Sequence, residues 1–177
     1  MKEKEIKRLT DMLEIENRLY DEGYINVCGV DEAGRGPLCG PVVAAAVILP
    51  KNEKIEGVND SKKLTEKKRE ALFDVIINKA VAYGIGISDV NVIEEVNILN
   101  ATKIAMKKAI ENLKVKADYV LIDGNQMIDI KIPAETVVSG DAKSESIAAA
   151  SIIAKVTRDR MLVEYDKKYP EYRICKA

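Results

Sequence analysis

The chain has 177 residues, of which 47% are hydrophobic and 32% are charged, and its formal net charge is −1. This composition is typical of a soluble globular protein, and the length suits one domain with a sizeable core. No apolar run approaches the about 20 residues that cross a bilayer. The charged N-terminus also lacks the apolar stretch of a secretory signal. We therefore expect a cytoplasmic protein that does not bind membranes.

The sequence contains no histidine. This excludes Ser-His-Asp and Cys-His catalysis and removes the commonest ligand of transition metals. The cysteines, Cys28, Cys39 and Cys175, form no C-x-x-C motif, and we interpret them as buried or idle free thiols. Acid–base or metal chemistry must then use carboxylates, lysines, tyrosines or water. Hard oxygen ligands of this kind suit Mg²⁺ or Mn²⁺.

The N-terminal third predicts a helix followed by two strands. Apolar residues recur at helical spacing over 3–21, and Gly23 ends that helix. Residues 25–30 have the pattern of a buried strand, with Asp31 at its C-terminal end. A turn rich in Gly and Pro follows, and residues 42–49 form a second strand that ends at Pro50.

In the remaining two thirds, strands alternate with helices. Thr65 is the expected N-cap of a helix that ends near Lys79. Strands are predicted over 81–87, 119–122 and 136–139, and helices over 97–113 and from Ser144 to about 168. This order predicts an α/β fold, in which helices cover both faces of a mixed sheet.

Acidic residues stand where the predicted strands end. Asp31 and Glu32 follow the first strand, Asp123 follows a later one, and Asp141 precedes the last helix. Ligands of open α/β sheets bind beyond the carboxyl ends of strands. Each aspartate alone is better explained by a turn or a helix start. The adjacent pair Asp31-Glu32 is different, because two neighbouring carboxylates repel each other and need water or a cation. Two metal ions held by about four carboxylates would relieve this repulsion and can hydrolyse a phosphodiester.

Four segments resemble the signature blocks of bacterial ribonuclease HII, the type 2 ribonuclease H. In family order they are GVDEAGRGPLCGPVVAAAVIL, NDSKKL followed by TEKKRE, VLIDGN, and GDAKSESIAAASIIAKVTRDR. The blocks lie within residues 25–160, most of the chain. DEAGRG alone is moderately specific, whereas four blocks in the family order make coincidence remote.

The resemblance implies an RNase H-like fold, with an N-terminal helical extension over 1–22 and a catalytic domain over 23–177. It implies an endoribonuclease that cleaves the RNA strand of RNA–DNA hybrids and incises duplex DNA at embedded ribonucleotides. The implied chemistry is two-metal-ion hydrolysis with Mn²⁺ or Mg²⁺, which leaves 5′-phosphate and 3′-hydroxyl ends. We expect a monomer whose partner is the hybrid or the ribonucleotide-containing duplex.

By the family motifs, the catalytic and metal-binding acids are Asp31, Glu32, Asp123 and Asp141. We prefer Asp141 to Asp159, because the family's last ligand lies just before the alanine-rich helix. Asp159 is several turns into that helix, and we interpret it as an ion-pair partner of Lys155.

The substrate contacts that the resemblance implies are Gly34, Arg35, Gly36, Lys62, Lys143 and Ser144. The first three match the family's ribonucleotide-sensing turn, where backbone groups approach a 2′-hydroxyl because side chains are absent. The alternative is a plain tight turn beside Pro37. Lys62, Lys143 and Ser144 are expected at phosphates, and the alternative is that they are solvated loop residues.

The family pattern normally continues beyond the point where this sequence ends. After a segment like EYDKKYPEY, members have a glycine-containing block with a tyrosine that stacks beside the ribonucleotide junction. Tyr165, Tyr169 and Tyr172 precede the place of that block, and we interpret them as packing on the last helix and its exit. Two alternative functions stay open. One is another RNase H-like nuclease, such as a Holliday-junction resolvase or a transposase-type domain, and the other is a hybrid-binding protein without catalysis.

Overall fold

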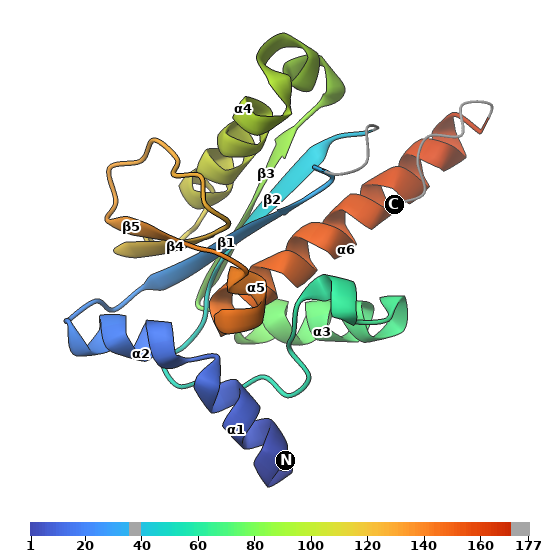
Figure 1. Cartoon of the computed structure of the whole chain (residues 1–177). Helices are drawn as coiled ribbons and strands as arrows, with labels where there is room; N and C mark the ends of the chain where they lie inside the picture. Colours follow the sequence, from blue (N-terminus) through green and yellow to red (C-terminus); the bar gives the residue numbers. More distant parts are fainter. Residues whose placement is uncertain (36–39, 171–177) are drawn as a thin grey trace.

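The structure is a computed structural model, and it describes residues 1–35 and 40–170. Its centre is a five-stranded mixed sheet in the order β3–β2–β1–β4–β5 (Figure 1). The strands are β1 Val27–Ala33, β2 Val42–Ile48, β3 Ala82–Ser88, β4 Tyr119–Asp123 and β5 Ala134–Val137. β2 is antiparallel to both β1 and β3, whereas β4 is parallel to β1 and to β5. The carboxyl ends of β1 and β4 therefore meet at one edge.

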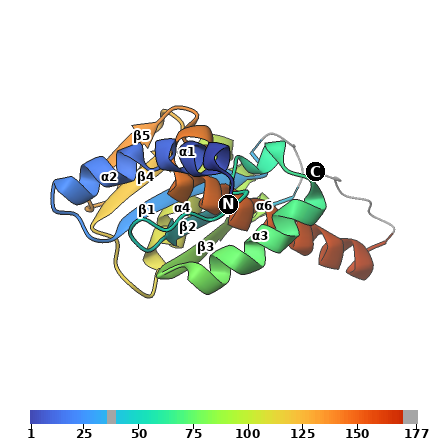
Figure 2. The same ribbon diagram turned by 90° about the horizontal axis from the view of Figure 1, so that it is seen from below.

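Helices cover both faces of the sheet, as the sequence predicts. They are α1 Glu3–Asp11, α2 Glu14–Asp21, the 3-10 turn η1 Ser61–Lys63, α3 Glu66–Lys79, α4 Val90–Glu111, α5 Gly140–Lys143 and α6 Glu145–Lys168. α4 packs on one face, while α6 lies on the other with α3 beside it (Figures 1 and 2). No helix in the described ranges is long and apolar enough to cross a bilayer.

The central strands carry small residues because helices pack against both faces of the sheet. Every residue of β2, VVAAAVI, is buried, as expected of a strand that is covered on both faces. In β3, a Cβ at Gly84 or Gly86 would lie about 2 Å from the carbonyl oxygen of Ala109 (2.1 Å) or Ala105 (1.9 Å). The two glycines thus allow α4 to lie against the backbone of the sheet.

The N-terminal helix predicted over 3–21 is two helices, separated at Met12 and Leu13. The carbonyl oxygen of Met12 accepts a hydrogen bond from the backbone N–H of Glu145, at 2.9 Å. Local periodicity does not reveal this break, because the contact that accompanies it joins residues far apart in the chain. Leu9 and Leu19 of the two helices are fully buried against the rest of the molecule. The division of the chain after residue 22 remains a prediction.

Three other boundaries differ from the predictions. β1 continues through Ala33, because it stays paired with β2 up to Val43, so Asp31 and Glu32 lie within the strand. α4 is two helices that meet at a kink at Asn97, whose φ is 74°: the second begins at the predicted position, where Asn97 Oδ1 accepts from the N–H of Asn100, and the first, capped by Asp89, was not predicted. β5 covers Ala134–Val137 rather than 136–139.

Candidate metal centre

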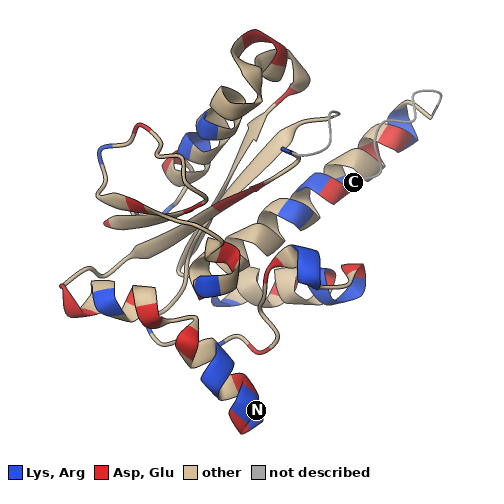
Figure 3. Cartoon of the chain, viewed as in Figure 1, with Lys and Arg blue, Asp and Glu red and all other residues tan. Residues whose placement is uncertain are grey.

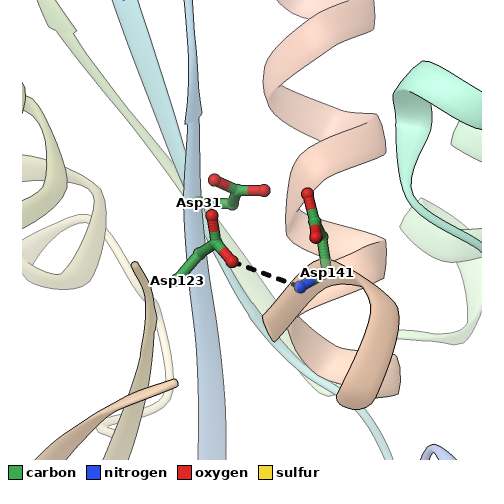
Figure 4. A group of neighbouring side chains, drawn as sticks. All are labelled: Asp31, Asp123 and Asp141. Atoms are coloured by element: carbon green, nitrogen blue, oxygen red, sulfur yellow. Dashed lines mark hydrogen bonds between the residues drawn. The ribbon is translucent and has the colours of Figure 1, made fainter. Parts of the chain in front are cut away.

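Three aspartates from different parts of the chain meet at one edge of the sheet. One carboxylate oxygen from each of Asp31, Asp123 and Asp141 lies within 4.8 Å of the other two (Figure 4). Asp31 is in β1, Asp123 is the last residue of β4, and Asp141 is in α5. The parallel register of β1 and β4 places the first two side by side. A set of carboxylate oxygens at this spacing suits a hard divalent cation.

The short helix α5 is held against Asp123. The backbone N–H of Asp141 donates a hydrogen bond to Oδ1 of Asp123, at 3.2 Å (Figure 4). A Cβ at Gly140 would lie 2.5 Å from Cδ1 of Ile147 and 3.2 Å from Oδ1 of Asp123. Glycine at position 140 therefore lets α5 approach β4 closely enough to bring in Asp141.

The Cβ atoms of Asp31 and Glu32 point to opposite faces of the sheet, but their carboxyl groups come within hydrogen-bonding distance of each other. In the β1–β2 pairing, Asp31 is opposite Ala45, which packs in the core under α6. Glu32 is opposite Ala44, which belongs to the core under α4. Successive side chains of a strand point to opposite faces. Among the described residues, the group of three aspartates does not include Glu32, whose carboxyl group contacts that of Asp31 and lines a pocket together with Asp123.

Without a cation, burial and mutual repulsion disfavour the charged forms of the carboxyl groups in the site. Burial and repulsion from Glu32 and Asp123 raise the pKa of Asp31 well above its usual value. Burial also raises the pKa of Glu32, and its Oε2 is buried with no hydrogen-bond partner in the described part of the chain. For Asp141, burial and then repulsion from Asp123 and Asp60 raise the pKa to about 6. Buried carboxylates with raised pKa values fit a site that a cation would neutralise.

The raised pKa of Asp141 predicts that the unfolding free energy of the metal-free protein depends on pH. The folded state binds this proton more tightly than the unfolded state, where the pKa is near 4. The metal-free protein should therefore lose stability as pH rises from about 4 through about 6, on the order of 3 kcal/mol for this group in full and about half of that between pH 5 and pH 7.5. Urea unfolding in EDTA at pH 5 and pH 7.5 measures the loss. Asp141→Asn should reduce it, and saturating Mn²⁺ should offset it. Equal stability of the metal-free protein at both pH values would contradict the prediction.

Of the three predicted phosphate contacts, two lie near the aspartates at the surface and one is buried. Lys62, in η1, is close enough to Asp141 to lower its pKa. Lys143 ends the same short helix as Asp141 and lines a pocket of about 450 Å³ with Lys63. Ser144 is fully buried, and its hydroxyl donates to Glu16. Because it is buried, Ser144 is not accessible to a phosphate in this structure. The motif match alone does not indicate which way its side chain points.

The predicted ribonucleotide-sensing turn is described for Gly34 and Arg35, and Gly36 lies outside the described residues. Gly34 has φ +95°, and a Cβ there would be 2.3 Å from Nε of Arg158 and 2.6 Å from the carbonyl oxygen of Pro41. Arg158 is buried in α6 and donates from Nε to that same carbonyl at 2.9 Å. The glycine thus allows the turn to lie directly against Arg158.

Replacing Gly34 with alanine should destabilise the protein by more than the backbone strain of about 1–2 kcal/mol, because the new Cβ would also collide with neighbouring atoms. Gly23→Ala is a matched control, since Gly23 has φ +101° and nothing within 4 Å of an added Cβ. Urea unfolding of both variants measures the difference. Equal losses of unfolding free energy would show that the turn has room for a side chain.

The interpretation of Asp159 is confirmed, since Nζ of Lys155 lies 3.0 Å from its Oδ1. Tyr165 and Tyr169 pack on each other at the end of α6, with ring centroids 4.9 Å apart. Cys28 is a buried free thiol, and burial raises its pKa to about 12. The interpretations of Cys39, Cys175 and Tyr172 concern positions outside the described ranges.

Sequence reasoning missed two residues near the site. Asp60, in the NDSKKL block, is nearly buried and faces Asp141 closely enough to raise its pKa. Its position within a block that resembles the family was the sequence feature that could have indicated a place near the site. Arg158, within the last of the four blocks, is buried, and nothing in its sequence context indicates this. Lys and Arg are otherwise spread over the helices (Figure 3).

Comparison with known proteins identifies the family of this chain. The family model described as Ribonuclease HII matches residues 28–176. The Ribonuclease HII of Acetivibrio thermocellus is 62% identical over 170 residues, 96% of this chain and 66% of the relative. That of Caldanaerobacter subterraneus subsp. tengcongensis is 57% identical over 174 residues, 98% of this chain and 72% of the relative.

The solved structure of the ribonuclease H2 from Pyrococcus horikoshii OT3 superimposes with a TM-score of 0.71 at 33% identity, over 83% of this chain and 78% of that one. This likeness confirms the predicted RNase H-like fold. The chain spans about two thirds of the length of the Acetivibrio relative. The matched residues include all four predicted acids, and the chain belongs to the ribonuclease HII family.

Proposed function

We propose that this chain is a metal-dependent endoribonuclease that cleaves the RNA strand of RNA–DNA hybrids. The observation that carries the proposal is the meeting of Asp31, Asp123 and Asp141 within 4.8 Å at the sheet edge. Membership of the ribonuclease HII family supports the reaction class. We extend the proposal to duplex DNA with embedded ribonucleotides, with Gly34, Arg35 and Gly36 as the sensing turn.

The proposed cofactor is Mn²⁺ or Mg²⁺, with two ions when substrate is bound. Asp31, Asp123 and Asp141 would hold one ion, and Glu32 with Asp123 faces the pocket on the other side of the strand. When bound, such ions supply an activated water and neutralise charge on the phosphate. The all-oxygen donor set and the raised carboxyl pKa values support this choice of cation.

The residues of the chain would orient the RNA strand over these acids. Lys62 lies close to Asp141 and Lys143 ends the same short helix, and both could hold phosphates through their ammonium groups. The turn at Gly34 would bring backbone groups to the ribose 2′-hydroxyl, which is recognised and is not the nucleophile. Attack of a water on the phosphorus, with the P–O3′ bond breaking and the 3′ oxygen taking up a proton, would give products with 5′-phosphate and 3′-hydroxyl ends.

Incision of three labelled duplexes tests the proposal, with Mg²⁺ and Mn²⁺ compared. The first duplex is an RNA–DNA hybrid, the second carries one ribonucleotide in DNA, and the third is an all-DNA four-way junction. We expect cleavage of the first two and none of the junction. Cleavage of the junction alone would instead indicate a resolvase-type nuclease. Hybrid binding without turnover in either metal would indicate a non-catalytic protein. Sedimentation of the same sample tests the predicted monomer.

A further inference from the structure

The first turn of α6 is tied to the two N-terminal helices. A helix begins with N–H groups that have no partner inside the helix. In α6, the N–H of Glu145 donates to the carbonyl oxygen of Met12 at 2.9 Å, and that of Ser146 donates to Oε2 of Glu16 at 3.1 Å. The N–H of the next residue donates to Oγ of Ser144 at 3.2 Å. Two of these three acceptors thus come from the segment before β1.

Glu16 is the centre of this connection. It lies in α2, is only 1% exposed, and receives three hydrogen bonds on one carboxylate oxygen. Besides the N–H of Ser146, the hydroxyls of Ser144 (3.0 Å) and Ser146 (2.9 Å) donate to Oε2. Oε1 is buried with no hydrogen-bond partner among the described residues, so the three bonds to Oε2 are what offsets the burial of this carboxyl group. Since Ser144 already caps α6 in the ordinary way, the carboxyl serves to join α2 to the α5–α6 corner, residues 140–147.

This corner carries Asp141. The N–H of Ser144 donates to the carbonyl oxygen of Gly140 at 2.7 Å, which closes the single turn of α5. At its other end, α5 is held by the hydrogen bond from the N–H of Asp141 to Asp123. A four-residue helix has little rigidity of its own. Its position therefore depends on β4 on one side and on the first turn of α6 on the other.

We propose that Glu16 is a positioning residue for the metal centre. It holds the α5–α6 corner at the distance from β1 and β4 that brings the carboxylate of Asp141 to those of Asp31 and Asp123. Groups that orient metal ligands from outside the coordination shell commonly change metal affinity by about 10- to 100-fold when they are replaced. The inference rests on the proposed metal site and assigns to the N-terminal helices a part in building it.

Isothermal titration calorimetry of the metal-free protein with Mn²⁺ measures the Mn²⁺ affinity and tests the proposal. Glu16→Ala removes the shared acceptor, and we expect it to weaken Mn²⁺ affinity by at least about tenfold. Glu16→Gln keeps a carbonyl oxygen that can accept the same three hydrogen bonds, and it should bind Mn²⁺ within about twofold of the wild type. This rescue by the conservative variant distinguishes hydrogen-bonded positioning from a need for charge. If Glu16→Ala does not fold, Ser146→Ala, which removes one of the donors, should still weaken Mn²⁺ binding.

Ile76→Ala is the control for general destabilisation, because Ile76 is fully buried in α3 and lies outside the corner. It should lower the unfolding temperature and leave Mn²⁺ affinity unchanged. Equal Mn²⁺ affinities of the wild type and Glu16→Ala would overturn the positioning role while the metal site stands. An equal loss of affinity in Ile76→Ala would also overturn it. Failure of the wild type to bind Mn²⁺ would overturn the proposed function as well.

Discussion

Replacing Asp31 with asparagine is expected to abolish cleavage with Mn²⁺ or Mg²⁺ and to leave the chain folded. The substitution keeps the shape of the side chain, but it removes a charged oxygen from the group of three aspartates. Loss of an outer-shell partner commonly costs about 10- to 100-fold in activity, so loss of a ligand should cost at least about 100-fold. Single-turnover cleavage of a hybrid at saturating metal measures the effect.

The stability of the same variant provides the control. Burial and the neighbouring carboxyl groups raise the pKa of Asp31, so this ionisable group makes the metal-free fold less stable at neutral pH than a neutral side chain would. Metal-free Asp31→Asn should then unfold at the same temperature as the wild type or higher. Mn²⁺ should raise the unfolding temperature of the wild type more than that of the variant. Full cleavage by the folded variant would show that Asp31 is not a required metal ligand.

Asp141→Asn and Asp159→Asn should differ by at least about 100-fold in cleavage. Asp141 belongs to the group of three aspartates, and its loss is equivalent to that of Asp31. Asp159 is engaged with Lys155 one turn earlier in α6. A partly exposed pair of this kind contributes about 0.3–0.5 kcal/mol. Asp159→Asn should therefore keep most of the activity and almost all of the stability.

Hybrid cleavage by the two variants, each at several Mn²⁺ concentrations, makes the comparison. Recovery of Asp141→Asn at high Mn²⁺ would indicate weakened metal binding and would agree with the assignment. Complete loss of cleavage in Asp159→Asn, with normal cleavage in Asp141→Asn, would reverse the choice between the two acids.

Local sequence pattern was enough to predict the frame of the site. The apolar runs before Asp31 and Asp123 mark β1 and β4, and parallel strands bring their carboxyl ends to one edge. The alanine-rich run after Ser144 marks α6, with Ser144 as its N-cap. These features are local, because strand and helix periodicities and caps depend on residues only a few positions apart.

The faces and partners of individual side chains were decided by the tertiary structure. The acids 31 and 32 are adjacent in the sequence, and the register with β2 places the Cβ of Glu32 on the α4 side while its carboxyl group still contacts that of Asp31. Arginine is usually exposed, yet Arg158 is buried and donates to the carbonyl oxygen of Pro41. Glu16 gave no signal, because its partners in α6 are about 130 positions away in the chain.

The sequence by itself therefore indicated the family, the strands and helices that frame the site, and four acids, Asp31, Glu32, Asp123 and Asp141, expected at one metal site, of which the structure groups the three aspartates. It could do so because these features depend on residue spacing within short segments and on motifs that occur in a fixed order. Only the tertiary structure decided that Glu32 faces a second pocket, that Ser144 is turned inward, and that the N-terminal helices anchor the α5–α6 corner. The physical reason is that burial and hydrogen bonding of these groups depend on segments that meet only after the chain has folded.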